Sequence, residues 1–142
     1  MKILSISLIA LVLLSSLAIG QDKPWSAEYE KGVGTASFQN VSLDQAWSAA
    51  VKTLMMDKYR VTSSEKTSGT LTAERRPAAA YNHILSLFFE EGSSGIKIMA
   101  SCEPLKKAEG LMAFTQQGKA MNKAHEKIEG KFFEALAAEL YK

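Results

Sequence analysis

The sequence predicts an α+β fold in which a single antiparallel sheet has two helices packed on one face, in the order β-α-β-β-β-β-α. Two amphipathic segments, 43–58 and 119–141, have apolar residues at the three- and four-residue spacing of helices. Between them lie short alternating segments separated by turn residues, as in an antiparallel meander. The composition, with 46% hydrophobic and 23% charged residues, is that of a globular domain.

Residues 1–20 have the features of a cleaved export signal. A lysine follows the first residue, and an apolar run covers residues 3–14. Ala18 and Gly20 are small, as signal peptidase requires before a cleavage at Gln21. We therefore expect a periplasmic protein, and no lipoprotein, because no cysteine follows the apolar run. An uncleaved anchor is the alternative, although the run is short of the roughly 20 residues that span a membrane.

The rest of the chain is expected to be one α+β domain, residues 31–142, preceded by a loose polar segment, 21–30. No linker or internal repeat divides residues 31–142. The first strand is expected at 31–38, although Gly32 and Gly34 weaken this prediction.

A capping box predicts where the first helix begins. The Ser42 hydroxyl can accept a hydrogen bond from the backbone N–H of Gln45, and the Gln45 side chain can reach back to Ser42. The helix is expected to end near Asp57 and Lys58. Its apolar stripe is formed by Leu43, Trp47, Ala50, Val51, Leu54 and Met55.

Four further strands are expected at 59–63, 70–75, 83–90 and 96–102. Gly69 can take the positive φ that closes a hairpin between the first two. The strand at 83–90 is apolar on both faces, which indicates a central position in the sheet.

The last element is expected to be a helix at 119–141, whereas residues 103–118 show no clear pattern. Gly130 weakens this helix by about 1 kcal/mol relative to alanine, which the long apolar face outweighs. That face is formed by Ala124, Ile128, Phe132, Leu136 and Leu140, with Met121, Phe133 and Ala135 beside them.

Three runs of sequence, 41–47, 54–62 and 69–74, carry a family resemblance. Their hydrophobic pattern resembles that of small bacterial envelope proteins of the uncharacterised DUF3568 family, and is similar in outline to the helix-grip domains of BamC-like lipoproteins. The resemblance covers about residues 38–102, roughly half of the chain. It implies a helix-grip-like fold and an envelope protein, and it carries no catalytic signature.

The composition argues against several function classes. Seventeen basic and fifteen acidic residues leave a net charge of +2, too little to attract nucleic acid. One cysteine excludes an internal disulfide and a thiolate-rich metal site. His83 and His125 are expected to be partly exposed structural residues, and Cys102 a buried residue at a strand end. We therefore expect no cofactor, no metal and no enzymatic activity; an enzyme that uses Cys102 is the weakest hypothesis.

Two groups of basic residues are candidates for contact with a partner. Arg75 and Arg76 at a strand end could hold a carboxylate or phosphate, although such pairs are common on solvated surfaces. Lys119, Lys123, Lys127 and Lys131 form a row at four-residue spacing, with Glu126 and Glu129 among them. Like charges at this spacing slightly destabilise a helix, so local stability does not explain the row. The row is therefore interpreted either as a solvated face or as a surface that contacts anionic headgroups or an acidic partner.

The sequence thus favours a non-enzymatic periplasmic accessory or interaction module of the cell envelope. Its expected partner is an envelope protein or an anionic membrane surface, and not nucleic acid. The alternative is a carrier that holds a small apolar ligand between the sheet and the C-terminal helix, since a helix-grip arrangement can open such a groove.

Overall fold

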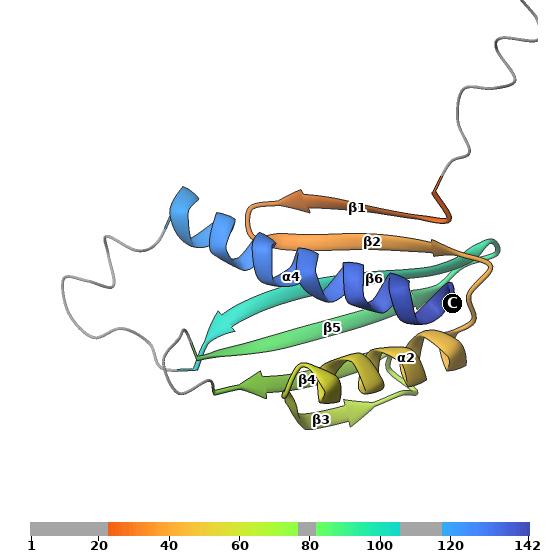
Figure 1. Cartoon of the computed structure of the whole chain (residues 1–142), viewed down its shortest axis with the longest axis horizontal. Helices are drawn as coiled ribbons and strands as arrows, with labels where there is room; N and C mark the ends of the chain where they lie inside the picture. The colour runs from red at the N-terminus through yellow and green to blue at the C-terminus, as the bar shows by residue number, and fades with distance from the viewer. Residues whose placement is uncertain (1–22, 77–81, 106–117) are drawn as a thin grey trace, which may run out of the picture.

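Six antiparallel strands form one sheet, and two helices cover one of its faces (Figure 1). The computed structural model describes residues 23–76, 82–105 and 118–142, so the predicted signal peptide lies outside the described residues. The elements are β1 (Trp25–Glu30), β2 (Val33–Gln39), α2 (Leu43–Met56), β3 (Arg60–Glu65), β4 (Thr70–Arg75), β5 (His83–Glu91), β6 (Gly95–Pro104) and α4 (Lys119–Leu140).

The strand order in the sheet is β1-β2-β6-β5-β4-β3. Strands β3 to β6 form a meander, and β2 pairs with β6 from the other side. Helix α4 packs on β1, β2 and β6, whereas α2 packs on β3 and β5. The α+β class, the antiparallel sheet, the two helices on one face and the central position of β5 are therefore confirmed.

The prediction of a loose segment at 21–30 is wrong for its second part, because β1 forms an edge strand there. Residues from Trp25 to Glu30 pair with β2, and the Trp25 ring stacks on Phe38 with centroids 5.9 Å apart. Lys31 and Gly32, which were expected to begin the first strand, instead form the turn, with φ values of 51° and 81°. Positive φ at both turn residues is typical of a two-residue hairpin. The order is therefore β-β-α-β-β-β-β-α.

Helix α2 begins with the predicted capping box between Ser42 and Gln45. A second contact fixes the same end, because the backbone N–H of Leu43 donates to the Glu91 carboxylate at 2.6 Å. The helix ends at Met56 with Asp57 as its C-cap, close to the predicted end near Asp57 and Lys58. Glu91 thus stabilises a helix start, where an acceptor for unpaired N–H groups is needed.

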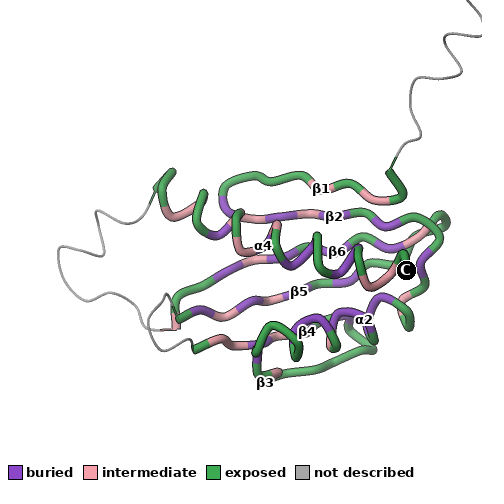
Figure 2. The backbone as a smooth tube through the Cα atoms, in the orientation of Figure 1, coloured by how far each residue is buried: buried purple, intermediate pink, exposed green. Residues whose placement is uncertain are grey.

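The core lies between the helices and the sheet, and the burial pattern alternates along the central strands (Figure 2). On β5, the side chains of Leu85, Leu87 and Phe89 are buried, and Trp47 of α2 packs on Phe89 with ring centroids 5.1 Å apart. No helix of the described residues covers the other face of the sheet. There the half-exposed Phe88 faces Met99 across β5 and β6.

Candidate functional site

The four lysines of α4, here called the lysine face, are Lys119, Lys123, Lys127 and Lys131, and all are exposed. Within the described part of the chain, none of them forms a salt bridge. The exposed residues between them include only small side chains, Ala120 and Ala124. The lysine face is therefore a strip about 18 Å long, given the rise of a helix.

The two glutamates among these lysines do not neutralise them. Glu126 is half-buried and accepts a hydrogen bond from the backbone N–H of Gly32 at 3.3 Å. Glu129 is fully buried against the sheet. In the sequence both residues lie among the lysines, whereas the structure turns them toward β1 and β2. The positive charge on the outer side of this helical segment is thus less diluted than the sequence suggests.

Arg75 and Arg76 have partners within the protein. The Arg75 Nε donates to the backbone oxygen of Asp57 at 2.9 Å, and its guanidinium lies 3.8 Å from the Asp57 carboxylate. The same guanidinium lies 5.9 Å from the centre of the Tyr59 ring. Arg76 forms an ion pair with Glu74 at 3.4 Å. The arginines therefore hold the end of α2 and the end of β4, and an incoming anion would have to displace these contacts.

The arginine pair and the lysine face do not form one site. The arginines lie at the end of β4, whereas the lysines lie on α4, which packs on β1, β2 and β6. Strand β5 separates β4 from β6. Of the two groups of basic residues, the lysine face alone is without ion pairs among the described residues.

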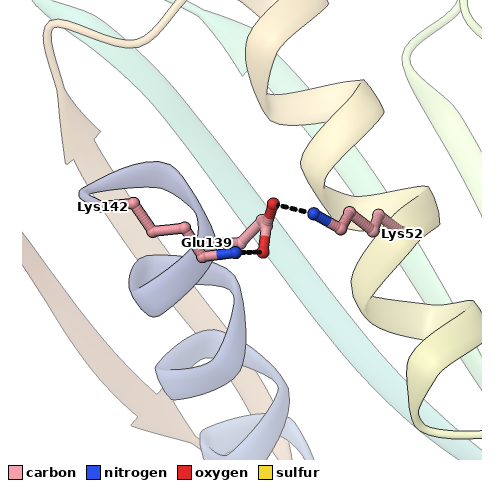
Figure 3. Close-up of polar contacts among 3 residues, drawn as sticks. All are labelled: Lys52, Glu139 and Lys142. Carbon is pink, nitrogen blue, oxygen red and sulfur yellow. Dashed lines mark hydrogen bonds and ion pairs between the residues drawn. The ribbon is translucent and has the colours of Figure 1, made fainter.

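A second polar group joins the two helices near the C-terminus (Figure 3). The Glu139 carboxylate accepts hydrogen bonds from Lys142 and Lys52, and these bonds lower the pKa of Glu139. A cleft of about 640 Å³ lies beside them, between α2 and the end of α4. The Tyr141 hydroxyl lies 2.9 Å from the carbonyl oxygens of Pro24 and Gln39. These groups satisfy one another, so the cluster is explained by helix–helix and helix–strand attachment.

The two histidines and the cysteine are buried, whereas a reactive side chain has to be accessible to its substrate. His83 and His125 were expected to be partly exposed, but both are buried, and the Tyr59 hydroxyl lies 2.7 Å from Nε2 of His83. Burial raises the pKa of Cys102 to about 12, and the negative charges of Glu129 and Glu103 add to this effect. A thiol with this pKa is protonated near neutral pH and is a poor nucleophile.

Glu129 is the feature that sequence reasoning missed. It lies four residues after His125 and three before Phe132, on the side of α4 that faces the sheet. The helical spacing therefore places Glu129 on the buried side of α4, but the charge of a glutamate favours the solvated side. Gly34 makes room for it, because a Cβ at Gly34 would lie 3.1 Å from the Glu129 carboxyl oxygen Oε2.

The space between α4 and the sheet is occupied by side chains of the protein itself. Phe38, Phe133 and Leu136 are almost fully buried there, and the rings of Phe38 and Phe133 lie 6.5 Å apart. A carrier would have to move these side chains to admit a ligand. No observation favours that hypothesis, which stays a prediction.

Comparison of the chain with models of protein families gives no match, and comparison with curated proteins gives none. The resemblance to small envelope proteins therefore stays a prediction. Neither helix of the described ranges is long and apolar enough to cross a membrane.

Proposed function

We propose that this protein is a non-enzymatic accessory module of the bacterial envelope whose lysine face binds an anionic membrane surface. One observation carries the proposal: four exposed lysines form a row on one helix, and none has an ion pair among the residues described. Such a row slightly destabilises the helix that contains it, and a surface of opposite charge offsets this effect.

The expected affinity is low and depends on salt. Each lysine near an anionic surface contributes about 1 kcal/mol, and the attraction is screened within a Debye length. The net charge of +2 gives the molecule little long-range attraction to the surface. Binding should therefore depend on the lysine face itself rather than on the total charge of the protein.

The test is co-sedimentation with vesicles that contain equal parts of phosphatidylcholine and phosphatidylglycerol, and with vesicles of phosphatidylcholine alone. At low ionic strength the protein should bind the anionic vesicles only. Substitution of Lys123→Glu together with Lys127→Glu should reduce binding by about tenfold or more.

The matched control is Lys23→Glu together with Lys58→Glu, which changes the net charge equally at two exposed lysines outside α4 that also form no ion pair among the described residues. The control should bind like the unmodified protein. Equal sedimentation of the lysine-face variant and the unmodified protein would show that the row is a solvated surface. Equal loss in both variants would show that only total charge matters.

The proposed location depends on the predicted signal peptide. An intact mass that begins at Gln21 for protein isolated from the envelope would support export with cleavage. A mass that retains residues 1–20 would contradict it.

A further inference from the structure

Glu129 occupies a site that is unfavourable for a carboxylate. Its exposed fraction is 0%, and neither carboxyl oxygen has a hydrogen-bond partner of normal geometry among the described residues. A carboxylate in an apolar site loses its hydration, which is costly unless a cation or several donors replace the water. Within the described ranges, no lysine or arginine forms an ion pair with Glu129.

Among the residues that the structure describes, the groups around Glu129 give no compensating positive charge. The Gly34 backbone on β2 lies beneath the carboxyl group, and the Phe133 ring lies beside it. The ionisable groups near it are Tyr29 on β1, Cys102 on β6 and, on α4 itself, Glu126 and His125; beyond them are His83 on β5, Glu103 on β6 and Glu134 on α4.

These neighbours favour the neutral acid. Tyr29 and Cys102 are neutral near pH 7, and Glu126 is an acid. Burial and the proximity of His83 lower the pKa of His125, which favours the neutral imidazole near pH 7.

We propose that the docking of the first part of α4, residues 119–129, is controlled by proton binding to Glu129. The neutral acid remains buried against Gly34 and Phe133. When the carboxyl group loses its proton, hydration of the carboxylate favours a state in which residues 119–129 separate from the sheet. The second part of α4 stays attached, because Phe133 and Leu136 are fully buried and Glu139 is held by Lys52.

The pH range follows from the shift of Glu129. Burial raises the pKa of the carboxyl group from 4.5 to about 8, the charge of Glu126 adds to the rise, and the Gly34 backbone partly offsets it. The docked state is therefore favoured at acid pH. Between these two pKa values, each unit of rising pH reduces the ratio of docked to separated α4 by about tenfold.

This control acts on the proposed membrane contact and, in that respect, rests on the proposed function. Lys119, Lys123 and Lys127 all lie in the segment that Glu129 holds. An anionic surface also concentrates protons, which favours the neutral form of Glu129. An anionic membrane that binds the lysines would thus also keep residues 119–129 docked on the sheet, with the lysines in one row.

The experiment measures amide hydrogen exchange by NMR in purified protein without vesicles. Protection factors, corrected for the intrinsic effect of pH, should fall by about a hundredfold for residues 122–129 between about pH 5.5 and 7.5. Residues 132–140 should change less. In Glu129→Gln the fall should be absent, whereas the control Glu134→Gln, an exposed acid on the same helix, should behave like the unmodified protein.

A constant protection factor in the unmodified protein, or the same fall in Glu129→Gln, would overturn the proposal. If Glu129→Gln does not fold, Glu129→Met provides the same test with an apolar side chain of similar size. The exchange experiment contains no membrane, so it tests the proton-dependent docking of α4 alone. The sedimentation experiment tests the proposed membrane binding, and either proposal can fail without the other.

Discussion

The hydroxyl oxygen of Tyr59 lies 2.7 Å from Nε2 of His83, and both side chains are buried. The two rings meet edge-on, with centroids 5.5 Å apart. Tyr59 directly precedes β3, and His83 is the first residue of β5. The pair therefore ties the segment after α2 to the centre of the sheet, across β4.

Substitution of Tyr59→Phe should lower the free energy of unfolding by about 1–2 kcal/mol, because it removes a hydrogen bond between buried groups. Urea denaturation measures this change. The control is Tyr29→Phe, since the Tyr29 hydroxyl makes no hydrogen bond among the described residues and its side chain is exposed. Equal effects of the two substitutions would show that the Tyr59–His83 bond adds nothing to stability.

Substitution of Phe133→Ala should lower the free energy of unfolding by about 3–5 kcal/mol, because Phe133 fills the space between α4 and the sheet. Phe88→Ala removes the same group from the uncovered face, where the side chain is 43% exposed, and should have a much smaller effect. Thermal denaturation of both variants distinguishes them. A similar loss in both would contradict the packing of α4 through Phe133.

Gly34 should not tolerate alanine. A Cβ there would lie 2.8 Å from Phe133 Cε2 and 3.1 Å from Glu129 Oε2, so α4 would have to move away from β2. We expect a loss of about 1–3 kcal/mol in urea denaturation. Gly92→Ala is the control, because the nearest atom to its Cβ would be 3.7 Å away. If Gly34→Ala is as stable as the unmodified protein, the burial of the Glu129 carboxyl group does not require the absence of a side chain at residue 34.

Cys102 should resist alkylation in the folded protein. Its pKa of about 12 leaves almost no thiolate near pH 8, and its side chain is buried. Iodoacetamide should therefore modify it many times more slowly in buffer than in denaturant, as measured by intact mass. Rapid modification in buffer would indicate an accessible thiol and would revive the enzyme hypothesis.

The stability of the whole protein should fall with rising pH because of Glu129. Its folded pKa of about 8 lies above the 4.5 of a solvated carboxyl group, so the folded state binds the proton more tightly. The contribution to stability is complete below about pH 4.5 and is lost, at up to about 1.4 kcal/mol per unit, as the pH rises to about 8. Urea midpoints across this range should fall in the unmodified protein and change less in Glu129→Gln. Parallel curves would contradict the raised pKa.

Local signals predicted most of the fold. The capping box at Ser42 and the positive φ of Gly69 depend on neighbours in the sequence, and both are present. β1 was missed because lysine rarely adopts positive φ, so Lys31 and Gly32 did not resemble a typical hairpin turn. Pairing with β2 then stabilises a segment whose own composition indicates a loop.

The surroundings of Glu129 could not be predicted in the same way. Its position on the buried side of α4 follows from helical spacing, but its burial depends on the absence of a side chain at Gly34. That contact joins residues far apart in the chain. The exposure of the lysine face, in contrast, was correctly expected, because helical periodicity alone separates Lys127 from the apolar stripe.

The pairing of β2 with β6 also sets the order in which the molecule can assemble. Strands β3 to β6 each pair with the next strand along the chain, so short loops close first. The pairing of β2 with β6 joins Gln39 to Gly95 and Val33 to Ser101, and such distant contacts form more slowly. The β1–β2 hairpin is thus expected to join a meander that has already formed, and α4, which packs on both β2 and β6, then closes the seam between them.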